Sequence, residues 1–212
     1  MTHTGGDDPL SLATSELKSE VVAFKRRRIL EVAAHLIYEK GYEGTRLDEI
    51  AANLQVTKPY LYSYFKNKAE ILFEICQTGI RLSLDELDAA LALDASPARR
   101  LQEGVERVAH VVIDKREYVV VYEREEKNLD PEDAQRIRDM RHQFDQRLSA
   151  LLREGVESGD FEVEDYSVAA TTIGGIVSWL PNWYVAGGRL SADQVVTITT
   201  RLVERMFRPD AR

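Results

Sequence analysis

The stretch VTKPYLYSYFKNKAEIL, Val56 to Leu72, decides how the first part of the chain is interpreted. Thr57 can cap a helix that holds Pro59 in its first turn, and Leu61 and Phe65 lie one turn apart on one face. Three tyrosines and three lysines share the stretch, in a chain whose net charge is −8. A short helix anchored by two apolar side chains leaves the tyrosines and lysines on its outer faces, which indicates a partner for them.

Two helices are predicted before this stretch. The first runs from about Val21 to Lys40, ends at Gly41, and has a buried stripe formed by Ile29, Ala33, Leu36 and Ile37. The second is predicted to start at Thr45, whose hydroxyl caps it while Asp48 reaches back. About two residues, Gln55 and Val56, join it to the helix at Thr57. A further helix follows, capped by Asn67 with Glu70 three residues on.

Two short helices joined by a tight turn predict a helix-turn-helix, whose second helix enters the major groove of duplex DNA. Lys58, Tyr60, Tyr62 and Tyr64 then remain on faces that DNA can reach, because Leu61 and Phe65 are used as anchors. Tyrosine suits this place, since its ring packs on the sugar-phosphate chain and its hydroxyl donates to a phosphate. Lys66 and Lys68 follow where phosphates would pass. Arg26–Arg28 is either a solvated face or a further set of phosphate contacts.

The charge distribution supports two functions within one chain. The 212 residues suit one large domain or a small domain joined to a larger one. Val21 to Glu70 carries nine Lys/Arg and six Asp/Glu, a net charge of +3, whereas the remainder has a net charge of −11. With one cysteine, no apolar signal region at the start and no apolar run of membrane-spanning length, we expect a cytoplasmic protein without a membrane partner.

The remainder of the chain predicts a second all-helical unit. Helices are expected to open at Ser96-Pro97, Asp130-Pro131, Asp165 and Ser191, each followed by apolar residues at helical spacing. The run EYVVVYERE favours a strand by propensity, but no partner strand is evident, so we predict a helix. Pro181 should end or kink the helix that opens at Asp165. The wide apolar coverage of the last two helices predicts a homodimer that buries them in a four-helix contact.

Arg28 to Leu72 resembles the N-terminal domain of the tetracycline-repressor (TetR) family over that domain's full length. The resemblance lies in ILEVAAHLIYEKGY, in Thr45 with Ile50-Ala51, and in LYSYFKNKAEIL. It implies an all-α homodimeric repressor that binds a pseudo-palindromic operator in double-stranded DNA. It also implies a DNA-binding domain at residues 20–67 and a ligand-binding and dimerisation domain at 68–212. The polar, Gly-containing residues 1–19 predict a flexible arm before them.

The same resemblance assigns DNA contacts residue by residue. In such proteins these contacts fall at Thr45, Arg46, Thr57, Lys58, Tyr60, Tyr62, Tyr64 and Lys68. Family members vary at Lys58 and Tyr60, so these two are predicted to read bases. Tyr62 and Lys68 match phosphate contacts.

The effector is less well marked than the DNA contacts. SWLPNWYVAGGRLSADQ, Ser178 to Gln194, resembles a branch of the family that regulates lipid and aromatic acyl-CoA catabolism, which implies an acyl-CoA thioester effector. Regulation of drug efflux by a hydrophobic, drug-like ligand is the alternative. Candidates to line the pocket, or else to lie in the core or dimer interface, are Tyr118, Tyr122, Phe144, Trp179 and Trp183.

Other functional classes find little support in the sequence. There is no Gly-rich phosphate loop, zinc-protease motif or nucleophile elbow, so we expect neither an enzyme nor a cofactor. His35, His110 and His142 lack metal-ligand spacing, and Cys76 is expected to be a small core residue. A helical interaction protein without DNA binding is the remaining alternative, which salt-dependent binding to duplex DNA would exclude.

Overall fold

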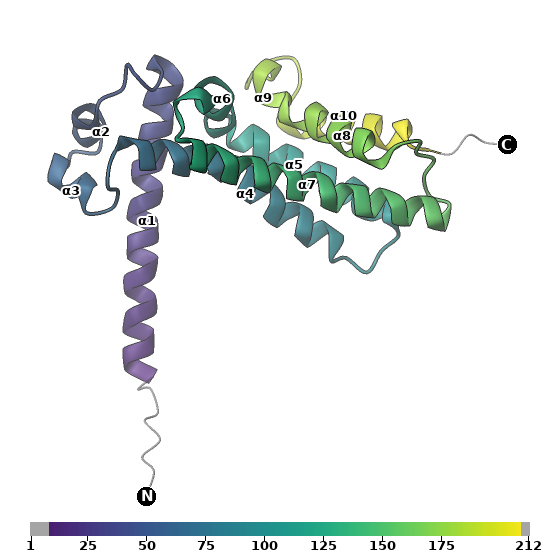
Figure 1. Cartoon of the computed structure of the whole chain (residues 1–212), viewed down its shortest axis with the longest axis horizontal. Helices are drawn as coiled ribbons and strands as arrows, with labels where there is room; N and C mark the ends of the chain where they lie inside the picture. Colours follow the sequence, from purple (N-terminus) through teal and green to yellow (C-terminus); the bar gives the residue numbers. More distant parts are fainter. Residues whose placement is uncertain (1–8, 209–212) are drawn as a thin grey trace, which may run out of the picture. The chain divides into compact units, whose positions relative to one another are not determined.

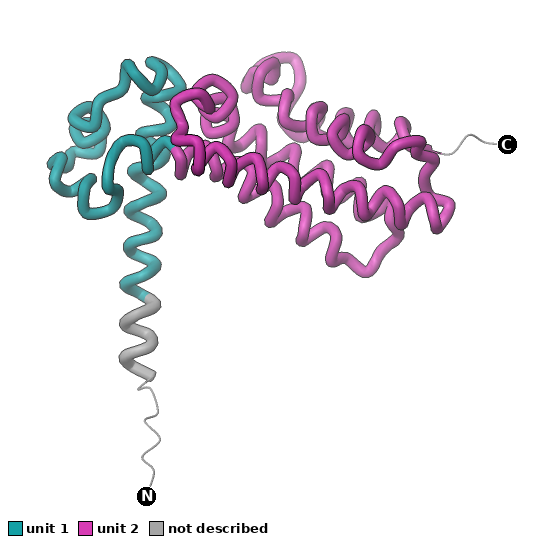
Figure 2. The backbone as a smooth tube through the Cα atoms, viewed as in Figure 1, with its two compact units in different colours: residues 1–72 teal, residues 73–212 magenta. Residues whose placement is uncertain are grey.

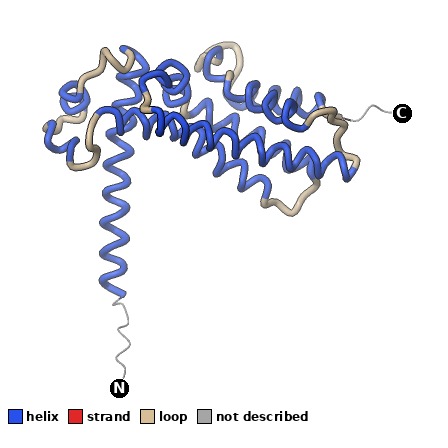
Figure 3. The backbone as a smooth tube through the Cα atoms, in the orientation of Figure 1, coloured by secondary structure: helices blue, strands red, loops and turns tan. Residues whose placement is uncertain are grey.

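The computed structural model describes the backbone of residues 9–208 and the side chains from residue 17 onward. Its contacts divide the chain into two compact units, residues 1–72 and 73–212 (Figure 2). Within the described residues all regular secondary structure is helical (Figure 3), so the all-α prediction is confirmed. The division into functional domains at residues 20–67 and 68–212 stays a prediction.

The first unit contains α1 (Pro9–Lys40), α2 (Leu47–Asn53), α3 (Lys58–Tyr62) and the start of α4 (Lys68–Leu91), as labelled in Figure 1. The predicted apolar stripe of α1 is buried, and so are the anchors of α2 and α3. Side chains that are at most 2% exposed include Ile29, Ala33, Ile37, Ile50, Leu61, Phe65, Ile71 and Leu72. One core therefore holds α2 and α3, which are too short to be stable alone, together with α1 and the start of α4.

Helix α1 starts earlier than the apolar pattern predicted. The arm expected at residues 1–19 lies partly outside the described residues, which begin at Pro9. From Pro9 onward the chain is helical, so α1 is 32 residues long. Leu17, Val21 and Phe24 on this first part are 62%, 45% and 53% exposed. Because these side chains form no buried stripe, the apolar pattern did not predict a helix here.

The predicted cap of α2 was wrong by one residue. Thr45 is fully buried, and its hydroxyl donates to the carbonyl oxygen of Gly41 at 2.9 Å, closing the turn after α1. Arg46 is the N-cap instead, and its N–H donates to Oε2 of Glu49 at 3.1 Å. The cap of α4 is as predicted, since the N–H of Glu70 donates to Oδ1 of Asn67 at 2.8 Å.

The second unit is a helical bundle built around α5. Helix α5 packs against α7, α8 and α10, and α7 packs along α8 (Figure 1). No helix in the described residues is long and apolar enough to cross a bilayer. Beyond α4, the elements are α5 (Pro97–Asp114), α6 (Arg116–Glu125), η1 (Glu126–Asn128), α7 (Pro131–Ser158), α8 (Tyr166–Ser178), α9 (Leu180–Trp183) and α10 (Ala192–Met206).

The four helix starts predicted for this unit are confirmed, three of them by side-chain caps; α7 opens at Asp130-Pro131 without one. Ser96 accepts from the N–H of Arg99 at 3.3 Å, and Asp165 accepts from two N–H groups at 2.9 Å. Ser191 accepts from Gln194 at 3.2 Å, and Gln194 reaches back to the N–H of Ser191 at 2.9 Å. The valine-rich run is helix α6, because burial of its valines against the bundle outweighs their strand propensity. Helix α8 ends before Pro181, which falls in the first turn of α9.

Gly155 makes room for the turn that follows α7. Its carbonyl oxygen accepts from the N–H groups of Asp160 at 2.8 Å and Phe161 at 3.0 Å. The ring of Phe161 folds back onto the helix, and a Cβ at position 155 would lie 2.0 Å from its Cδ2 atom. The turn and the buried ring thus require glycine at this position.

We expect Gly155→Ala to lower the free energy of unfolding by about 1–3 kcal/mol, because the new methyl overpacks the site against a buried ring. Gly174→Ala in α8 is the matched control, since its Cβ would meet Asp145 and Phe144 at ordinary contact distances of 3.7 and 4.0 Å. Urea unfolding of both variants at equal protein concentration measures the effect. A Gly155→Ala protein as stable as the control would show that the Phe161 ring moves aside freely.

Candidate nucleic-acid interface and ligand pocket

Helices α2 and α3 form the helix-turn-helix that the sequence predicts. Leu61 and Phe65 are 1% and 2% exposed and fix the orientation of α3 from one side. The link between the helices includes Gln55, whose φ of 56° lies in the left-handed region. A non-glycine residue there is uncommon and costs about 1–3 kcal/mol, so the rest of the unit must hold this turn. The burial of Leu61 and Phe65 and the turn at Gln55 together decide which side chains of α3 face outward.

Two of the predicted DNA contacts lie at the start of α2, and they differ in accessibility. Thr45 is fully buried with its hydroxyl bonded inside the unit, which argues against a direct contact with DNA. Its role in this structure is to close the turn that places α2. Arg46 is exposed at the N-cap, where its side chain can reach a partner.

The start of α3 presents an exposed Thr57 and an exposed Lys58. The ammonium of Lys58 lies 3.2 Å from Oδ2 of Asp48, with the two side chains 43% and 69% exposed. An ion pair this exposed is worth about 0–1 kcal/mol, so an incoming phosphate or base can displace it. In the absence of a partner, Asp48 holds the lysine near the N-terminus of the reading helix.

Tyr60 and Tyr64 form a pair on α3 and the turn after it. Their ring centroids lie 5.0 Å apart at an interplanar angle of 56°. Burial, followed by the hydrogen bond with Tyr64, raises the pKa of Tyr60 above its ordinary value. The hydroxyl therefore stays protonated at neutral pH, and the packed ring gives it a defined direction.

The other two predicted contacts are Tyr62 and Lys68. Tyr62 is 50% exposed and makes no hydrogen bond within the described part of the chain. Lys68 is half-buried at the start of α4, where its ammonium donates to the carbonyl oxygen of Tyr42 and lies 4.0 Å from the centroid of that ring. Lys68 thus ties the start of α4 to the turn that follows α1.

Arg26 joins three parts of the first unit. The sequence had left the role of this arginine undecided. Its guanidinium donates to the carbonyl oxygen of Tyr64, lies 4.2 Å from the Phe65 ring centroid and is 3.6 Å from Glu70. The sequence showed only a run of three arginines, and nothing in that run separates Arg26 from Arg28. The latter pairs with Glu31 on its own helix at 2.5 Å. Arg26 is a structural residue that holds the end of the helix-turn-helix.

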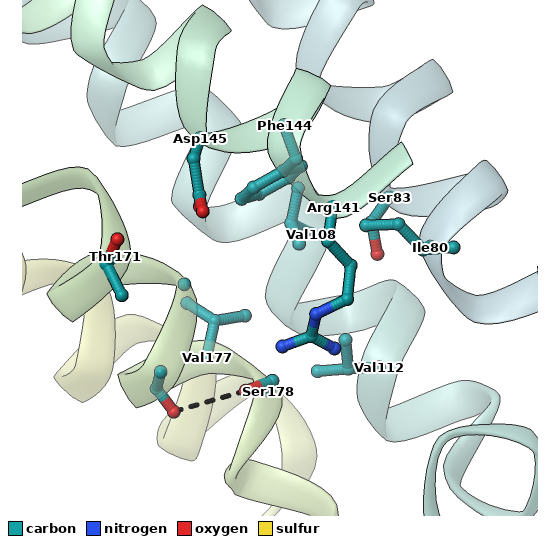
Figure 4. Close-up of a pocket in the computed structure, with 12 residues that line it drawn as sticks. Ile80, Ser83, Val108, Val112, Arg141, Phe144, Asp145, Thr171, Val177 and Ser178 are labelled. Atoms are coloured by element: carbon teal, nitrogen blue, oxygen red, sulfur yellow. Dashed lines mark hydrogen bonds between the residues drawn. The ribbon is translucent and has the colours of Figure 1, made fainter. Parts of the chain in front are cut away.

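A pocket of about 160 Å³ opens in the second unit between α4, α5, α7 and α8 (Figure 4). Of the five aromatic residues predicted to line an effector site, only Phe144 lines this pocket. Its walls also include residues that the sequence did not single out, because they are ordinary in type and far apart in the chain. The lining comprises Ile80, Ser83, Val108, Val112, Arg141, Phe144, Asp145, Thr171, Gly174, Gly175, Val177 and Ser178.

The other four aromatic candidates lie elsewhere. Tyr118 is buried at 8% exposure, and Tyr122 is half-buried with its ring 5.6 Å from the Arg141 guanidinium. Trp179 is the C-cap of α8 and Trp183 is the last residue of α9, and the two side chains are 60% and 51% exposed. None of these four lines this pocket, so their contact with an effector stays a prediction; the alternative of a place in the core fits the buried Tyr118.

Burial raises the pKa of three groups in the described part of the second unit, namely Cys76, Tyr122 and Asp145. Burial raises the pKa of Asp145 in the pocket, while Arg141 and His142 act in the opposite direction. Burial, with a further contribution from Glu125 and Glu126, raises the pKa of Cys76 to about 12. The Cys76 thiol therefore stays protonated at neutral pH, as suits a small core residue. No cluster of metal-ligating side chains occurs among residues 17–208.

Comparison with known proteins gives a consistent answer over both units. The family model for bacterial regulatory proteins of the tetR family matches residues 29–75, and that for the tetracyclin repressor-like C-terminal domain matches residues 94–207. The HTH-type transcriptional repressor KstR2 of Mycolicibacterium smegmatis is 26% identical, over 82% of this chain and 85% of its own.

Two solved structures match over most of the chain. The TetR family transcriptional regulator PfmR of Thermus thermophilus is 31% identical, with a TM-score of 0.77 over 84% of this chain and 97% of that one. AibR, solved in complex with isovaleryl coenzyme A and operator DNA, is 28% identical, with a TM-score of 0.72 over 84% and 96% of the two chains.

We expect Arg26→Ala to lower the free energy of unfolding by about 1–3 kcal/mol, because it removes a charged donor to a main-chain carbonyl together with the contact on Phe65. Arg28→Ala is the matched control, because its exposed pair with Glu31 should contribute less than about 1 kcal/mol. Thermal unfolding followed by circular dichroism measures both. Equal losses from the two variants would show that Arg26 does not hold the unit together.

Proposed function

We propose that this chain, which belongs to the tetracycline-repressor (TetR) family of transcriptional regulators, binds a pseudo-palindromic operator as a homodimer and is released from it by a small effector. As a member of that family the chain is a transcriptional regulator and not an enzyme. The observation that carries the proposal is the accessible face of α3. Lys58 and Tyr62 are exposed there, while Leu61 and Phe65 fix the helix from behind.

We assign different tasks to the side chains of this face. Lys58 and Tyr60 read base edges, because they lie on the N-terminal part of the helix that enters the major groove. Tyr62 donates its hydroxyl to a phosphate, and Lys68 and Arg46 contact phosphates beside it. Thr57 lies next to the DNA backbone. Tyr64 supports the ring of Tyr60.

The homodimer is proposed to form through α8 and α10. Apolar side chains remain exposed along both helices, with Val168 at 64%, Ile198 at 45%, Leu202 at 54% and Met206 at 48%. On α10 the last three recur every four residues, so they form one row along the helix. A symmetric copy would cover this row in a four-helix contact, and a two-fold pair suits a pseudo-palindromic operator.

The proposed effector is an acyl-CoA thioester that binds in the pocket of the second unit. Support comes from AibR, which was solved with isovaleryl coenzyme A. Ile80 and Ser83 of the pocket wall belong to α4, the helix that begins in the first unit. A ligand that repositions α4 would change the spacing of the two reading helices. Release requires that the effector bind the DNA-incompetent state more tightly, and tenfold release needs only about 1.4 kcal/mol of coupling.

We expect Lys58→Ala to weaken binding to a site selected from a random-sequence library by about 1–3 kcal/mol, with a much smaller effect on unselected DNA. Tyr62→Phe removes only a hydroxyl and should weaken both by the same amount, about 0.5–1.5 kcal/mol. Fluorescence anisotropy across a salt series measures both. Selection that returns no preferred, salt-dependent site would favour an interaction protein over a repressor. Lys68→Ala is a less direct test, because Lys68 also holds Tyr42.

We expect Leu202→Asp to convert the dimer into a folded monomer, since the new carboxylate would be buried without a partner in the four-helix contact. Thr197→Asp adds the same charge to an exposed position off the apolar row of α10 and should leave the dimer intact. Sedimentation velocity distinguishes the two outcomes. A Leu202→Asp protein that remains dimeric would place the interface on another surface.

A further inference from the structure

We infer that the pocket of the second unit selects a compact acyl group of about six to eight non-hydrogen atoms, with the carbonyl oxygen of that group held at Arg141. The inference rests on the proposed function and specifies which acyl thioesters serve as effector. It draws on the size of the pocket, the apolar character of its floor and the charged groups at its mouth (Figure 4).

The floor of the pocket offers only apolar contacts. Val108 and Val112 of α5, Phe144 of α7 and Val177 of α8 form it, and these side chains are 3–8% exposed. Ser83 is also buried there, but its hydroxyl already donates to the carbonyl oxygen of Gly79 at 2.9 Å. A ligand group that reaches the floor must therefore be a hydrocarbon.

The volume limits the length of that hydrocarbon. A dry cavity of about 150 Å³ holds benzene, so the pocket of about 160 Å³ holds a branched five-carbon acyl group or a benzoyl group. A twelve-carbon chain does not fit unless the surrounding helices separate. Since α5, α7 and α8 are packed against one another in the bundle, separating them would cost core contacts.

The mouth of the pocket carries one cation and one carboxyl group, both on α7. Arg141 is exposed, and its guanidinium makes no hydrogen bond or ion pair within residues 17–208. Its N–H groups are therefore available to a ligand oxygen, and Figure 4 shows the side chain extending across the mouth toward α8. Asp145 lies one turn further along α7 and is half-buried.

The carboxyl group favours a thioester over a free acid. A ligand carboxylate next to Asp145 would place two negative charges in one partly desolvated site, which weakens binding. A thioester carbonyl accepts from Arg141 without adding a charge there. Arg141 of α7 is exposed at the mouth, on a helix outside the proposed dimer contact, which leaves a path on that side by which the rest of a CoA ester can extend into solvent.

Calorimetric titration of the full chain tests the inference without DNA. The probes are 3-methylbutanoyl-CoA, benzoyl-CoA, dodecanoyl-CoA, CoA alone and free 3-methylbutanoate. We expect the two compact thioesters to bind at least about tenfold more tightly than the other three probes. Dodecanoyl-CoA binding as tightly as benzoyl-CoA would overturn the size limit. Failure of both compact thioesters to bind would overturn the inference as a whole.

Variants of α7 test the position of the carbonyl group. Arg141→Gln should weaken the compact thioesters by about tenfold to a hundredfold, because it replaces a charged donor. Arg138→Gln is the matched control, since Arg138 lies one turn earlier and pairs with Glu126 at 3.8 Å outside the pocket. Asp145→Asn should strengthen binding of free 3-methylbutanoate more than that of its thioester. Equal affinities for the two arginine variants would overturn the role of Arg141.

A smaller pocket tests the size limit independently. Gly174→Ala adds one methyl group to the wall, at ordinary contact distance from Phe144 and Asp145. It should weaken benzoyl-CoA while leaving acetyl-CoA unchanged, and an equal effect on both would contradict the assigned location. Anisotropy with operator DNA separates this inference from the proposed function. A compact thioester that binds through Arg141 yet releases no DNA would support the pocket and reject the induction mechanism.

Discussion

The burial of Leu61 and Phe65 is the constraint on which the reading of DNA depends. A helix of five residues has no stability of its own, because forming its first turn costs more than one hydrogen bond returns. Helix α3 exists because these two side chains are fixed in the core and because Arg26 holds the carbonyl oxygen that follows it. Every outward direction on α3 is a consequence of that anchoring. The left-handed Gln55 shows that the same anchoring tolerates backbone strain in the turn.

The second unit resolves a different conflict, between a complete core and exposed apolar surface. Its bundle packs α5 against three other long helices, yet α10 keeps a row of apolar residues exposed while its polar neighbours face the same solvent. A single chain has no second hydrophobic core in which the side chains of this row could be buried. The exposed Arg201 and Arg205 flank this row on the same helix, so the proposed symmetric contact would combine an apolar centre with charged edges.

Much of the fold follows from local chemistry, and much of the site does not. Caps such as Ser96 and Ser191 bond within one helical turn, so the local sequence is enough to predict them. The start of α2 was misplaced because the Thr45 hydroxyl found a carbonyl oxygen in the preceding turn, a competition that spacing does not show. The α3 face was predictable because one helix carries it. The pocket was not, since four helices build it and Arg141 looks like the other arginines of α7 in the sequence.

Helix α4 is a single unbroken rod from Lys68 to Leu91, and it borders the pocket at Ile80. Ile80 lies near the middle of α4, about 18 Å of helix axis from Lys68, so the pocket borders the helix well away from its first turn. A tilt of about 5° at Ile80 moves the far end by about 1.5 Å. If the proposed effector acts through α4, its acyl group therefore has to produce a tilt of only a few degrees, which fits the modest coupling energies typical of ligand-controlled proteins.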